Sequence, residues 1–437
     1  MSSKPTLRCH SVSVRRIGLA LVLPLVLAAT GVRAQDAVRP SLAGEAAAES
    51  RRQSLDRIPY NLLVGPVRFR ISATAGLEYN DNINYAEINT EEDFIFRPQA
   101  NLNILWPITQ LNTLRLDLGA GYAFHFDHPE HNTNSILISP GSQLSFDVFV
   151  SDFRINFHDR FSLEQDPIGE PGLSNVTDYG RFQNTAGVSV LWDLNKVVLT
   201  LGYDHYNFIA TNDDFEYLDR NSEILMASIS VAATSTTGVG IEGTYVFNRY
   251  DLDQLNDSDT FSIGAFVETQ LTSYLRLRLA GGYQAISFDD GDTIILGFPG
   301  SGNFLILSDQ ADLDDYYINL LISHRINAAI THRLALGHES QFGVNSNFVT
   351  LNYVRHTATW NIINRTLIST ELFYEEADDS GGINEHFNRY GGALALGYQL
   401  TRHVTLGARY QYTQKDSDIF LRDYRQNRIS IDGTYSF

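Results

Sequence analysis

The last ten residues of this 437-residue chain constrain its fold more than any other segment. Residues 428–437 alternate strictly between apolar and polar side chains, and the apolar positions are Ile429, Ile431, Tyr435 and Phe437. Successive side chains of a β-strand point to opposite faces, so this segment predicts a strand with one apolar and one polar face. Residues 114–118, 153–157 and 275–279 show the same alternation. We therefore expect an antiparallel all-β protein.

The first 34 residues have the pattern of a secretory signal peptide. Basic residues precede an apolar run at residues 17–27, which is too short for a membrane-spanning helix and is interrupted by Pro24. We expect cleavage after Ala34, followed by a periplasmic extension at residues 35–66. The single cysteine, Cys9, lies in the signal, so the mature chain is expected to contain no disulfide.

The mature chain is expected to be strongly acidic. The full sequence has 32 basic and 51 acidic residues, a formal charge of −19. Five of the basic residues lie in the first 34, which leaves 27 basic residues and a charge of −24 after cleavage. Such a chain is not expected to bind nucleic acid through its phosphates.

Short turns and long polar connections alternate along residues 67–437. Eight short turns are expected at residues 109–112, 150–152, 193–196, 235–237, 271–273, 327–329, 364–365 and 400–403. Nine longer connections are expected at residues 80–92, 127–134, 164–178, 212–221, 250–259, 289–315, 343–347, 375–385 and 416–423. Their alternation predicts eighteen strands, with about 21 residues for each strand and its connection, which suits membrane strands of about 9–11 residues.

An even number of strands with both termini at the short-turn end is typical of bacterial outer-membrane barrels. Residues 67–437 are therefore expected to form a transmembrane, up-and-down antiparallel β-barrel in the outer membrane of a Gram-negative cell, with periplasmic termini. In such a barrel the final strand, with Tyr435 and Phe437, is expected to act as the signal for the barrel-assembly machinery. Lipid and lipopolysaccharide are the expected surroundings.

The three tryptophans each precede a short turn. Because interfacial aromatic residues form girdles around membrane barrels, Trp106, Trp192 and Trp360 are expected to mark the periplasmic rim. The alternative is that they belong to the core of an ordinary sheet.

Arginines alternate with apolar residues in several expected strands. An arginine facing lipid at the bilayer midplane would cost about 2–4 kcal/mol, so these side chains are expected to face the lumen. The candidates for the pore lining are Arg115, Asp117, Arg154, Arg160, Arg276, Arg278, Arg333, Arg409 and Arg428. They either form a basic constriction that attracts anions or are neutralised by acidic residues such as Asp204, Glu339 and Asp432.

An eighteen-stranded barrel is too wide to be filled by its own wall and contains an aqueous channel unless something plugs it. The longest connection, residues 289–315, is unusually apolar. It is expected either to extend the wall as an extracellular hairpin or to fold inward as a constriction.

No cofactor or catalytic site is expected. Asp251, Asp253, Asp257 and Asp259 are spaced as in a calcium loop, but the glycine and final glutamate of an EF-hand are missing, so solvated loop charge is favoured over a calcium site. The histidines are scattered and no hydrolase motif is present. In the adjacent pairs at residues 158–159 and 204–205, the two side chains point to opposite faces, so neither pair forms a dyad. The chain is not expected to be an enzyme.

A short motif carries a resemblance to a known family. Tyr79, Asn80, Asp81, Asn82 and Ile83 follow a glycine at the end of the first expected strand. This box, with the lead-in from residue 55, resembles the putative β-barrel porin 2 family, and the similarity would cover residues 55–437. Members often lie in exopolysaccharide gene clusters, which implies an exit channel paired with a periplasmic polysaccharide-export protein. The resemblance transfers no ligand-binding residue.

The sequence therefore predicts an outer-membrane porin, with export of an acidic exopolysaccharide as the favoured function. A general or an anion- or sugar-selective diffusion porin is the first alternative. A structural or adhesive barrel, with a closed lumen and acidic partner-binding loops, is the second.

Overall fold

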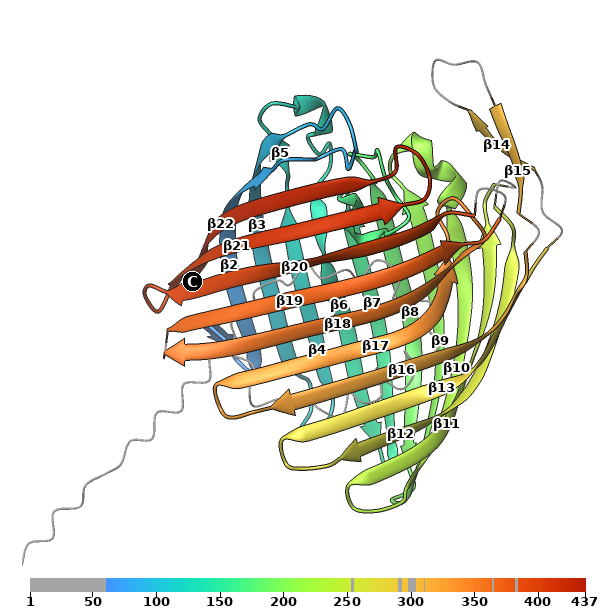
Figure 1. The fold of residues 1–437 in the computed structure, drawn as a ribbon. Coiled ribbons are helices and arrows are strands. Elements are labelled where there is room, and N and C mark those ends of the chain that lie inside the picture. The colour runs from blue at the N-terminus through green and yellow to red at the C-terminus, as the bar shows by residue number, and fades with distance from the viewer. Residues whose placement is uncertain are drawn as a thin grey trace, which may run out of the picture.

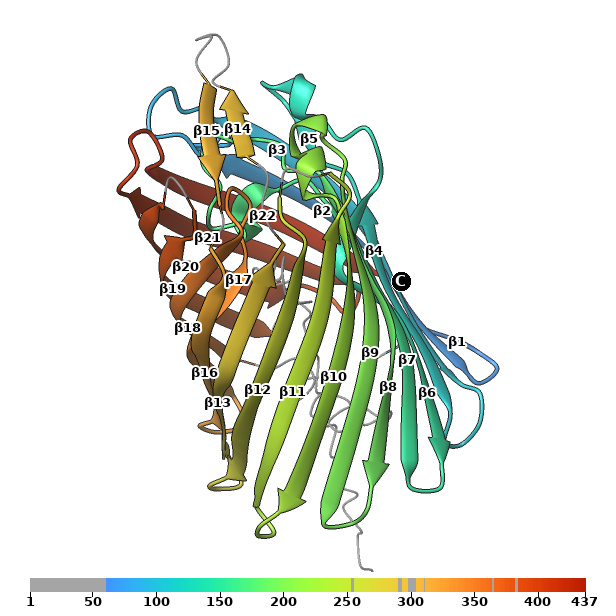
Figure 2. The same cartoon turned by 90° about the vertical axis from the view of Figure 1, so that its right-hand side faces the viewer.

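The computed structural model describes residues 60–437, apart from residues 253–254, 290–292, 298–303, 310, 364 and 382–383. The predicted signal peptide and most of the predicted extension lie outside the described residues. The chain forms a closed antiparallel barrel of eighteen strands, which confirms the predicted fold (Figures 1 and 2). Among the described residues, no helix is long and apolar enough to cross a membrane.

Each barrel strand pairs with the next one along the chain, and the last pairs with the first. The barrel strands are β2 (Val67–Asn80), β3 (Asp93–Pro107), β4 (Thr113–Gly121), β6 (Leu137–Val150), β7 (Phe153–Glu164), β8 (Arg181–Asp193), β9 (Val197–Ala210), β10 (Arg220–Ala232), β11 (Thr237–Tyr250), β12 (Ser258–Gln270), β13 (Leu275–Phe288), β16 (Leu313–Arg325), β17 (Ile330–Phe342), β18 (Phe348–Ile363), β19 (Thr366–Asp379), β20 (His386–Gln399), β21 (Val404–Ser417) and β22 (Tyr424–Ser436). The closing pair β2–β22 runs from Ser72–Ser436 to Asn80–Arg428. The eight predicted short turns all lie at one end of the barrel, here called the short-turn end, and the nine long connections lie at the loop end.

A few short elements supplement the barrel. Strand β1 (Leu62–Val64) folds back on β2, and β5 (Phe124–His125) continues the pairing of β4 with β3. In the described part of the chain, short 3-10 helices lie in three of the loops: η3 (Pro129–His131), η4 (Pro167–Gly169) and η5 (Asp213–Leu218).

The longest connection forms a hairpin. Strands β14 (Thr293–Gly297) and β15 (Phe304–Ser308) make a separate two-stranded sheet that stands beyond the barrel wall at the loop end (Figures 1 and 2). Of the two predicted arrangements for residues 289–315, the described part of this connection shows the hairpin.

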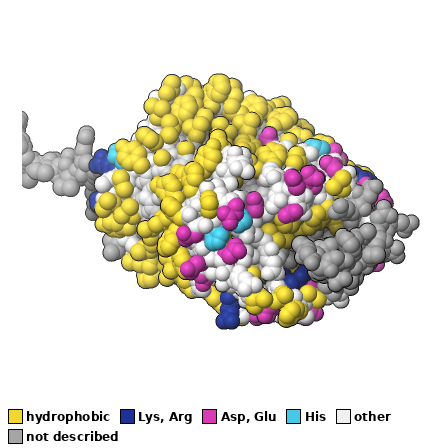
Figure 3. Space-filling view, turned by 90° about the horizontal axis from the view of Figure 1, so that it is seen from above, with side chains coloured by type: hydrophobic (Ala, Val, Ile, Leu, Met, Phe, Trp, Pro, Cys, Tyr) yellow, Lys and Arg dark blue, Asp and Glu magenta, His cyan; other side chains and the backbone are white. Residues whose placement is uncertain are grey.

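The wall has an apolar outer face and a polar inner face. Large hydrophobic side chains at alternate positions remain exposed, for example Leu201, Ile241, Leu394 and Ile431, because they face outward where lipid replaces water. Figure 3 shows hydrophobic side chains over the wall and acidic side chains gathered near the loops. The Trp106, Trp192 and Trp360 side chains also face outward, next to short turns.

Candidate functional site

The nine charged residues predicted for the lumen lie on one face of the wall. Residues directly opposite each other in an antiparallel pair share a face. The pairs Arg276–Ser323, Ser323–Arg333 and Arg333–Thr357 therefore place the two arginines on the same side. The strand registers place on this inner face Arg115, Asp117, Arg154, Arg160, Arg276, Arg278, Arg333, Arg409 and Arg428. Their action as a pore lining stays a prediction.

Many of these arginines lie beside carboxylates. The Arg278 guanidinium contacts Glu242 at 2.6 Å, and both side chains are almost fully buried. Other pairs join Arg154 to Asp147 at 3.0 Å, Arg409 to Glu371 at 3.3 Å and Arg276 to Glu268 at 3.8 Å. Acidic residues therefore neutralise many of these arginines, as one of the two predicted alternatives states. The acidic residues that do so are not the ones that the sequence had suggested. Asp117 instead accepts hydrogen bonds from Asn103 and Gln143.

The loop between β7 and β8, residues 165–180, folds into the barrel and crosses its interior. Its first anchor is Asp166, whose carboxylate contacts Arg428 of β22 at 2.8 Å and accepts a hydrogen bond from the Tyr85 hydroxyl at 2.8 Å. Arg428 also contacts Glu78 of β2 at 2.8 Å. Burial alone would raise the pKa of Asp166, but the nearby Arg428 and Arg97 outweigh it and hold this pKa well below its usual range.

A second set of anchors comes from β20 and β21. Arg389 donates from Nη1 to the Ile168 carbonyl at 3.0 Å, and Lys415 donates from Nζ to the Gly172 carbonyl at 3.2 Å. Carboxylates hold both cations, Glu375 at 2.7 Å from Arg389 and Glu385 at 2.9 Å from Lys415. These anchors lie several strands away from β7 and β8 around the wall, so the loop bridges the lumen.

Two further hydrogen bonds fix the middle of the loop. The Ser174 hydroxyl donates to the Arg422 carbonyl at 2.8 Å, and Asn175 Nδ2 donates to the Leu421 carbonyl at 2.7 Å. Both acceptors belong to the loop between β21 and β22. Two loops from distant parts of the sequence are therefore joined at the barrel mouth.

An apolar cluster lies behind these polar anchors. It combines residues of four loops with residues on the inner faces of β9, β10 and β11. The loop residues are Leu173, Tyr179, Phe215, Leu218, Leu255 and Val344, and the strand residues are Tyr206, Phe208, Ile224 and Val246. Arg220 of β10 lies 4.9 Å from the Phe208 ring centroid and covers part of the cluster. Together, the cluster and the anchors narrow the loop end of the lumen.

Glu170 is buried within the same loop. Burial raises the pKa of its carboxyl, although the positive charges of Arg181, Arg220 and Arg389 act in the opposite direction. The pKa values of Asp166 and Glu170 are therefore shifted in opposite directions, the first lowered and the second raised.

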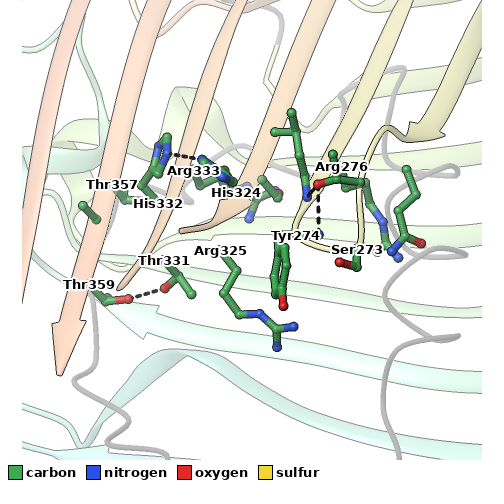
Figure 4. A pocket seen from close by; sticks show the side chains of 15 residues that line it. Ser273, Tyr274, Arg276, His324, Arg325, Thr331, His332, Arg333, Thr357 and Thr359 are labelled. Carbon is green, nitrogen blue, oxygen red and sulfur yellow. Dashed lines mark hydrogen bonds between the residues drawn. The ribbon is translucent and has the colours of Figure 1, made fainter. Parts of the chain in front are cut away.

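A recess of about 570 Å³ lies at the other end of the lumen. It is lined by residues of β13, β16, β17 and β18, among them His324 and His332, and by the turn at residues 272–274 (Figure 4). Arg276, Arg325 and Arg333 border it. Two of these arginines were predicted for the lumen, whereas Arg325 was missed because it ends its strand beside a turn.

The family-like motif closes the seam between the first and last strands. Asp81 accepts hydrogen bonds from the backbone and side-chain nitrogens of Asn427 at 2.6 and 2.7 Å. Asn82 donates to the Arg425 carbonyl at 2.9 Å and exchanges two hydrogen bonds with the Ala86 backbone. The rest of the motif packs locally: Asn80 caps the turn, Ile83 is buried against Ile95 and Ala123, and Tyr79 bonds Glu92. The motif's contacts are structural.

The carboxyl terminus completes the same seam at the other end. The Phe437 amide donates to the Ile71 carbonyl at 3.2 Å, and the Tyr435 and Phe437 rings meet edge to face at 5.1 Å. Both side chains are exposed on the outer face. Their role as an assembly signal stays a prediction.

The acidic loop at residues 250–259 is organised by an arginine. Arg249 contacts Asp259 at 2.9 Å and Asp257 at 3.7 Å, and Asp257 also accepts from the Tyr250 amide. Asp253 lies outside the described residues. No group of three or more metal-ligating side chains suited to an ion occurs in the part of the chain that the structure describes.

His158 and Asp204, which are far apart in the sequence, are in contact on the inner face. His158 Nε2 lies 2.9 Å from Asp204 Oδ1, across the intervening strand β8, and His158 Nδ1 lies 3.0 Å from Asn156. The two adjacent pairs at residues 158–159 and 204–205 are indeed split between faces, but one member of each meets on the inner face. No sequence motif marks this contact, because it depends on the register of three strands.

Comparisons with known proteins found similar solved structures and a matching family. Solved structures similar to the chain include the outer membrane protein OpdK of Pseudomonas aeruginosa, at 12% identity over 84% of this chain and 99% of that one, with a TM-score of 0.44. OccK5 (OpdH) of Pseudomonas aeruginosa is 10% identical over 86% and 99%, with a TM-score of 0.46. OccAB3 of Acinetobacter baumannii is 11% identical over 86% and 100%, with a TM-score of 0.44. No curated protein sequence matches the chain.

The model of one protein family matches residues 63–301, more than half of the chain. This match includes the seam motif, and it agrees with the resemblance that the motif suggested. The fold and the family together place the protein in the outer membrane as a porin-like barrel. The chain belongs to the putative beta-barrel porin 2 family.

Proposed function

We propose that the protein is a non-enzymatic channel for anionic solutes, narrowed at its loop end by residues 165–180. The observation that carries this proposal is the placement of arginines on the inner face, in a chain whose overall charge is strongly negative. Loop acids remain outside, as at Asp213 and Asp214. Cations that line a water-filled path favour the passage of anions.

The inward loop favours small solutes over polymers in this conformation. A sugar chain needs a continuous opening of about a nanometre, by analogy with wide porins. The anchors at Asp166, Ile168 and Gly172 hold the loop across that opening. The diffusion-porin alternative is therefore the function that the geometry supports best.

Ion selectivity tests the proposal. The purified barrel is reconstituted in a planar bilayer, and the reversal potential is measured across a potassium chloride gradient. We expect chloride to permeate better than potassium. Arg278 is unsuited to mutation because it forms a buried pair with Glu242, so the informative variant is the double substitution Arg276→Glu and Arg333→Glu, which should shift the selectivity toward potassium.

A matched control changes the same charge at the same end of the barrel. Lys196 and Arg402 lie in short turns outside the strands, and replacing both by Glu should leave the selectivity unchanged. Preference of the unmodified protein for potassium, or equal effects of the two double variants, would contradict the proposal.

Export of an acidic exopolysaccharide is a second candidate, supported by the basic recess at the short-turn end, which faces the periplasm in barrels of this type. It requires residues 165–180 to leave the lumen, and we propose that a periplasmic polysaccharide-export protein would deliver the polymer. An in-frame deletion of the gene tests this candidate. Loss of polysaccharide from the medium with accumulation in the periplasm would support export, and normal secretion would reject it.

A further inference from the structure

The basic recess lies at the short-turn end, far from the loop that narrows the other end of the lumen. We propose that this recess is a binding site for a carboxylated saccharide that arrives from the periplasm. The inference rests on the proposed channel function and adds to it a ligand class and a place of first contact.

The strand registers bring three guanidinium groups to one recess. Arg276, Ser323 and Arg333 stand side by side on β13, β16 and β17. Two strand spacings therefore separate the arginine backbones, about 10 Å. Arg325 lies on the same face, two residues closer to the turn. An extended ligand that follows the wall would meet more than one of these cations.

Arg276 is held more loosely than Arg278 of the same strand. The Arg276–Glu268 separation is 3.8 Å, longer than a hydrogen bond, and both side chains are more than 30% exposed. In contrast, Arg278, one step deeper on the same strand, contacts Glu242 at 2.6 Å and is buried. Arg276 is therefore accessible to a ligand, whereas Arg278 is not.

The other side chains of the recess suit a sugar. Hydroxyl groups of Ser323, Thr331, Thr357 and Thr359 line it, and hydroxyls both donate and accept hydrogen bonds. The exposed Tyr274 ring lies beside Arg325, with the guanidinium carbon 5.3 Å from the ring centroid (Figure 4). An aromatic ring offers an apolar surface to one face of a pyranose.

The chemistry of arginine indicates which charged group the ligand carries. The planar guanidinium matches a carboxylate with two parallel hydrogen bonds. A small inorganic anion would satisfy the arginines but leave the tyrosine and the row of hydroxyls unused. The combination of three arginines, several hydroxyls and one aromatic ring therefore favours a saccharide that carries carboxylates.

The position of the recess sets the direction of approach. Short turns of outer-membrane barrels face the periplasm, and the recess includes the turn residues Thr272, Ser273 and Tyr274. The opposite mouth carries acidic loops and the inward loop, which disfavour entry of an acidic chain from outside. The first contact is therefore expected on the periplasmic side.

Calorimetric titration of the purified full-length barrel in detergent tests the site. The probes are trigalacturonate, its neutral trimethyl ester and inorganic phosphate. We expect trigalacturonate to bind at least tenfold more tightly than either of the others. The double substitution Arg276→Gln and Arg333→Gln should weaken trigalacturonate binding at least tenfold, whereas Lys196→Gln with Arg402→Gln should not change it.

Two further variants keep the test decisive. Tyr274→Ala should weaken the binding of both the acid and the ester, because the ring serves the sugar and not its charge. If the glutamine pair fails to fold, as judged by heat-dependent migration in gels, Arg276→Lys with Arg333→Lys replaces it, and weaker binding is again expected because lysine lacks the planar fork.

The proposed site would be overturned if the trimethyl ester or phosphate bound as tightly as trigalacturonate. It would also be overturned if the arginine variants bound trigalacturonate as tightly as the unmodified protein does. These failures are distinct from failure of the channel. A barrel that conducts chloride but ignores trigalacturonate retains the proposed function without this site, and one that binds the trisaccharide without conducting ions loses the proposed function.

Discussion

The contact between His158 and Asp204 shows how single residues determine what the inner wall can hold. The two side chains reach each other across β8 because the residue between them, in register with both, is Gly187. A β-carbon at position 187 would collide with Asp204 Oδ1. The glycine is therefore needed for the space it leaves and not for an unusual backbone conformation.

Replacement of Gly187 by Ala should break this contact. The buried histidine and aspartate would lose their hydrogen bond, and we expect a loss of about 1–3 kcal/mol in the free energy of unfolding. Urea titration in lipid vesicles, followed by tryptophan fluorescence, measures it. The control is Gly76→Ala, since the nearest atom to its new methyl group would be 3.7 Å away. Equal effects of the two alanines would refute the steric account.

The seam motif allows a second prediction for a single residue. Asn82 binds both the Arg425 carbonyl of the last strand and the Ala86 backbone. Its replacement by Ala should leave buried polar groups unpaired and lower the temperature at which the folded band disappears in detergent gels. Asn84→Ala is the control, because among the described residues the side chain of Asn84 bonds within its own loop, to Asn89 and Glu91. A control that melts as early as the Asn82 variant would show that the seam is not the cause.

Among the elements of the fold, the loop at residues 165–180, between β7 and β8, turns into the lumen of the barrel. Its sequence contains two prolines and three glycines, which suit turns and exclude a regular strand. Asp166 caps the short helix η4 by accepting from the Ile168 amide, so the loop enters the lumen with a defined shape. Its charge is then available to Arg428.

The shifted pKa values of Asp166 and Glu170 in this loop predict a dependence on pH. The pKa of Asp166 is lowered, so its contribution is fully present above the ordinary aspartate pKa and is constant at neutral pH. The pKa of Glu170 is raised by burial, so its contribution is present below the ordinary glutamate pKa and is lost as pH rises through the shifted value. The loop should therefore dock more tightly in acid.

We expect the single-channel conductance to be smaller at pH 5 than at pH 8, because a docked loop narrows the lumen. Glu170→Gln should remove most of this difference. The rest is expected from Asp178, because burial raises the pKa of its carboxyl as well. Glu87, which is exposed, provides the control substitution Glu87→Gln. A pH response that persists unchanged in the Glu170 variant would assign it to other groups.

At the scale of the whole molecule, alternation and turn residues were enough to predict the barrel. A shift of one residue in the register of a strand would turn its inward-facing charged side chains, such as Arg276, toward lipid. The alternation of apolar and polar residues therefore predicted which side chains of each strand face the lumen. The number of strands followed from the turns, as at residues 109–112 and 400–403.

The interior could not be predicted in the same way. Whether Arg278 faces water or Glu242 depends on register across β12, because Glu242 belongs to β11. The inward path of residues 165–180 depends on anchors such as Arg389 and Lys415, which follow it by more than 200 positions in the sequence. Contacts between residues so far apart in the sequence leave no local pattern, so the sequence did not identify residues 165–180 as a loop that folds inward.

The proposed function depends on an anion-conducting lumen that residues 165–180 narrow. The most direct test is the single-channel conductance of the barrel in planar bilayers, before and after residues 169–176 are replaced by a short glycine–serine linker. A matched control shortens the exposed segment at residues 87–90. We expect a small, anion-selective conductance that rises severalfold only when the inward loop is removed. An unchanged conductance, or none in either protein, would contradict the proposed function.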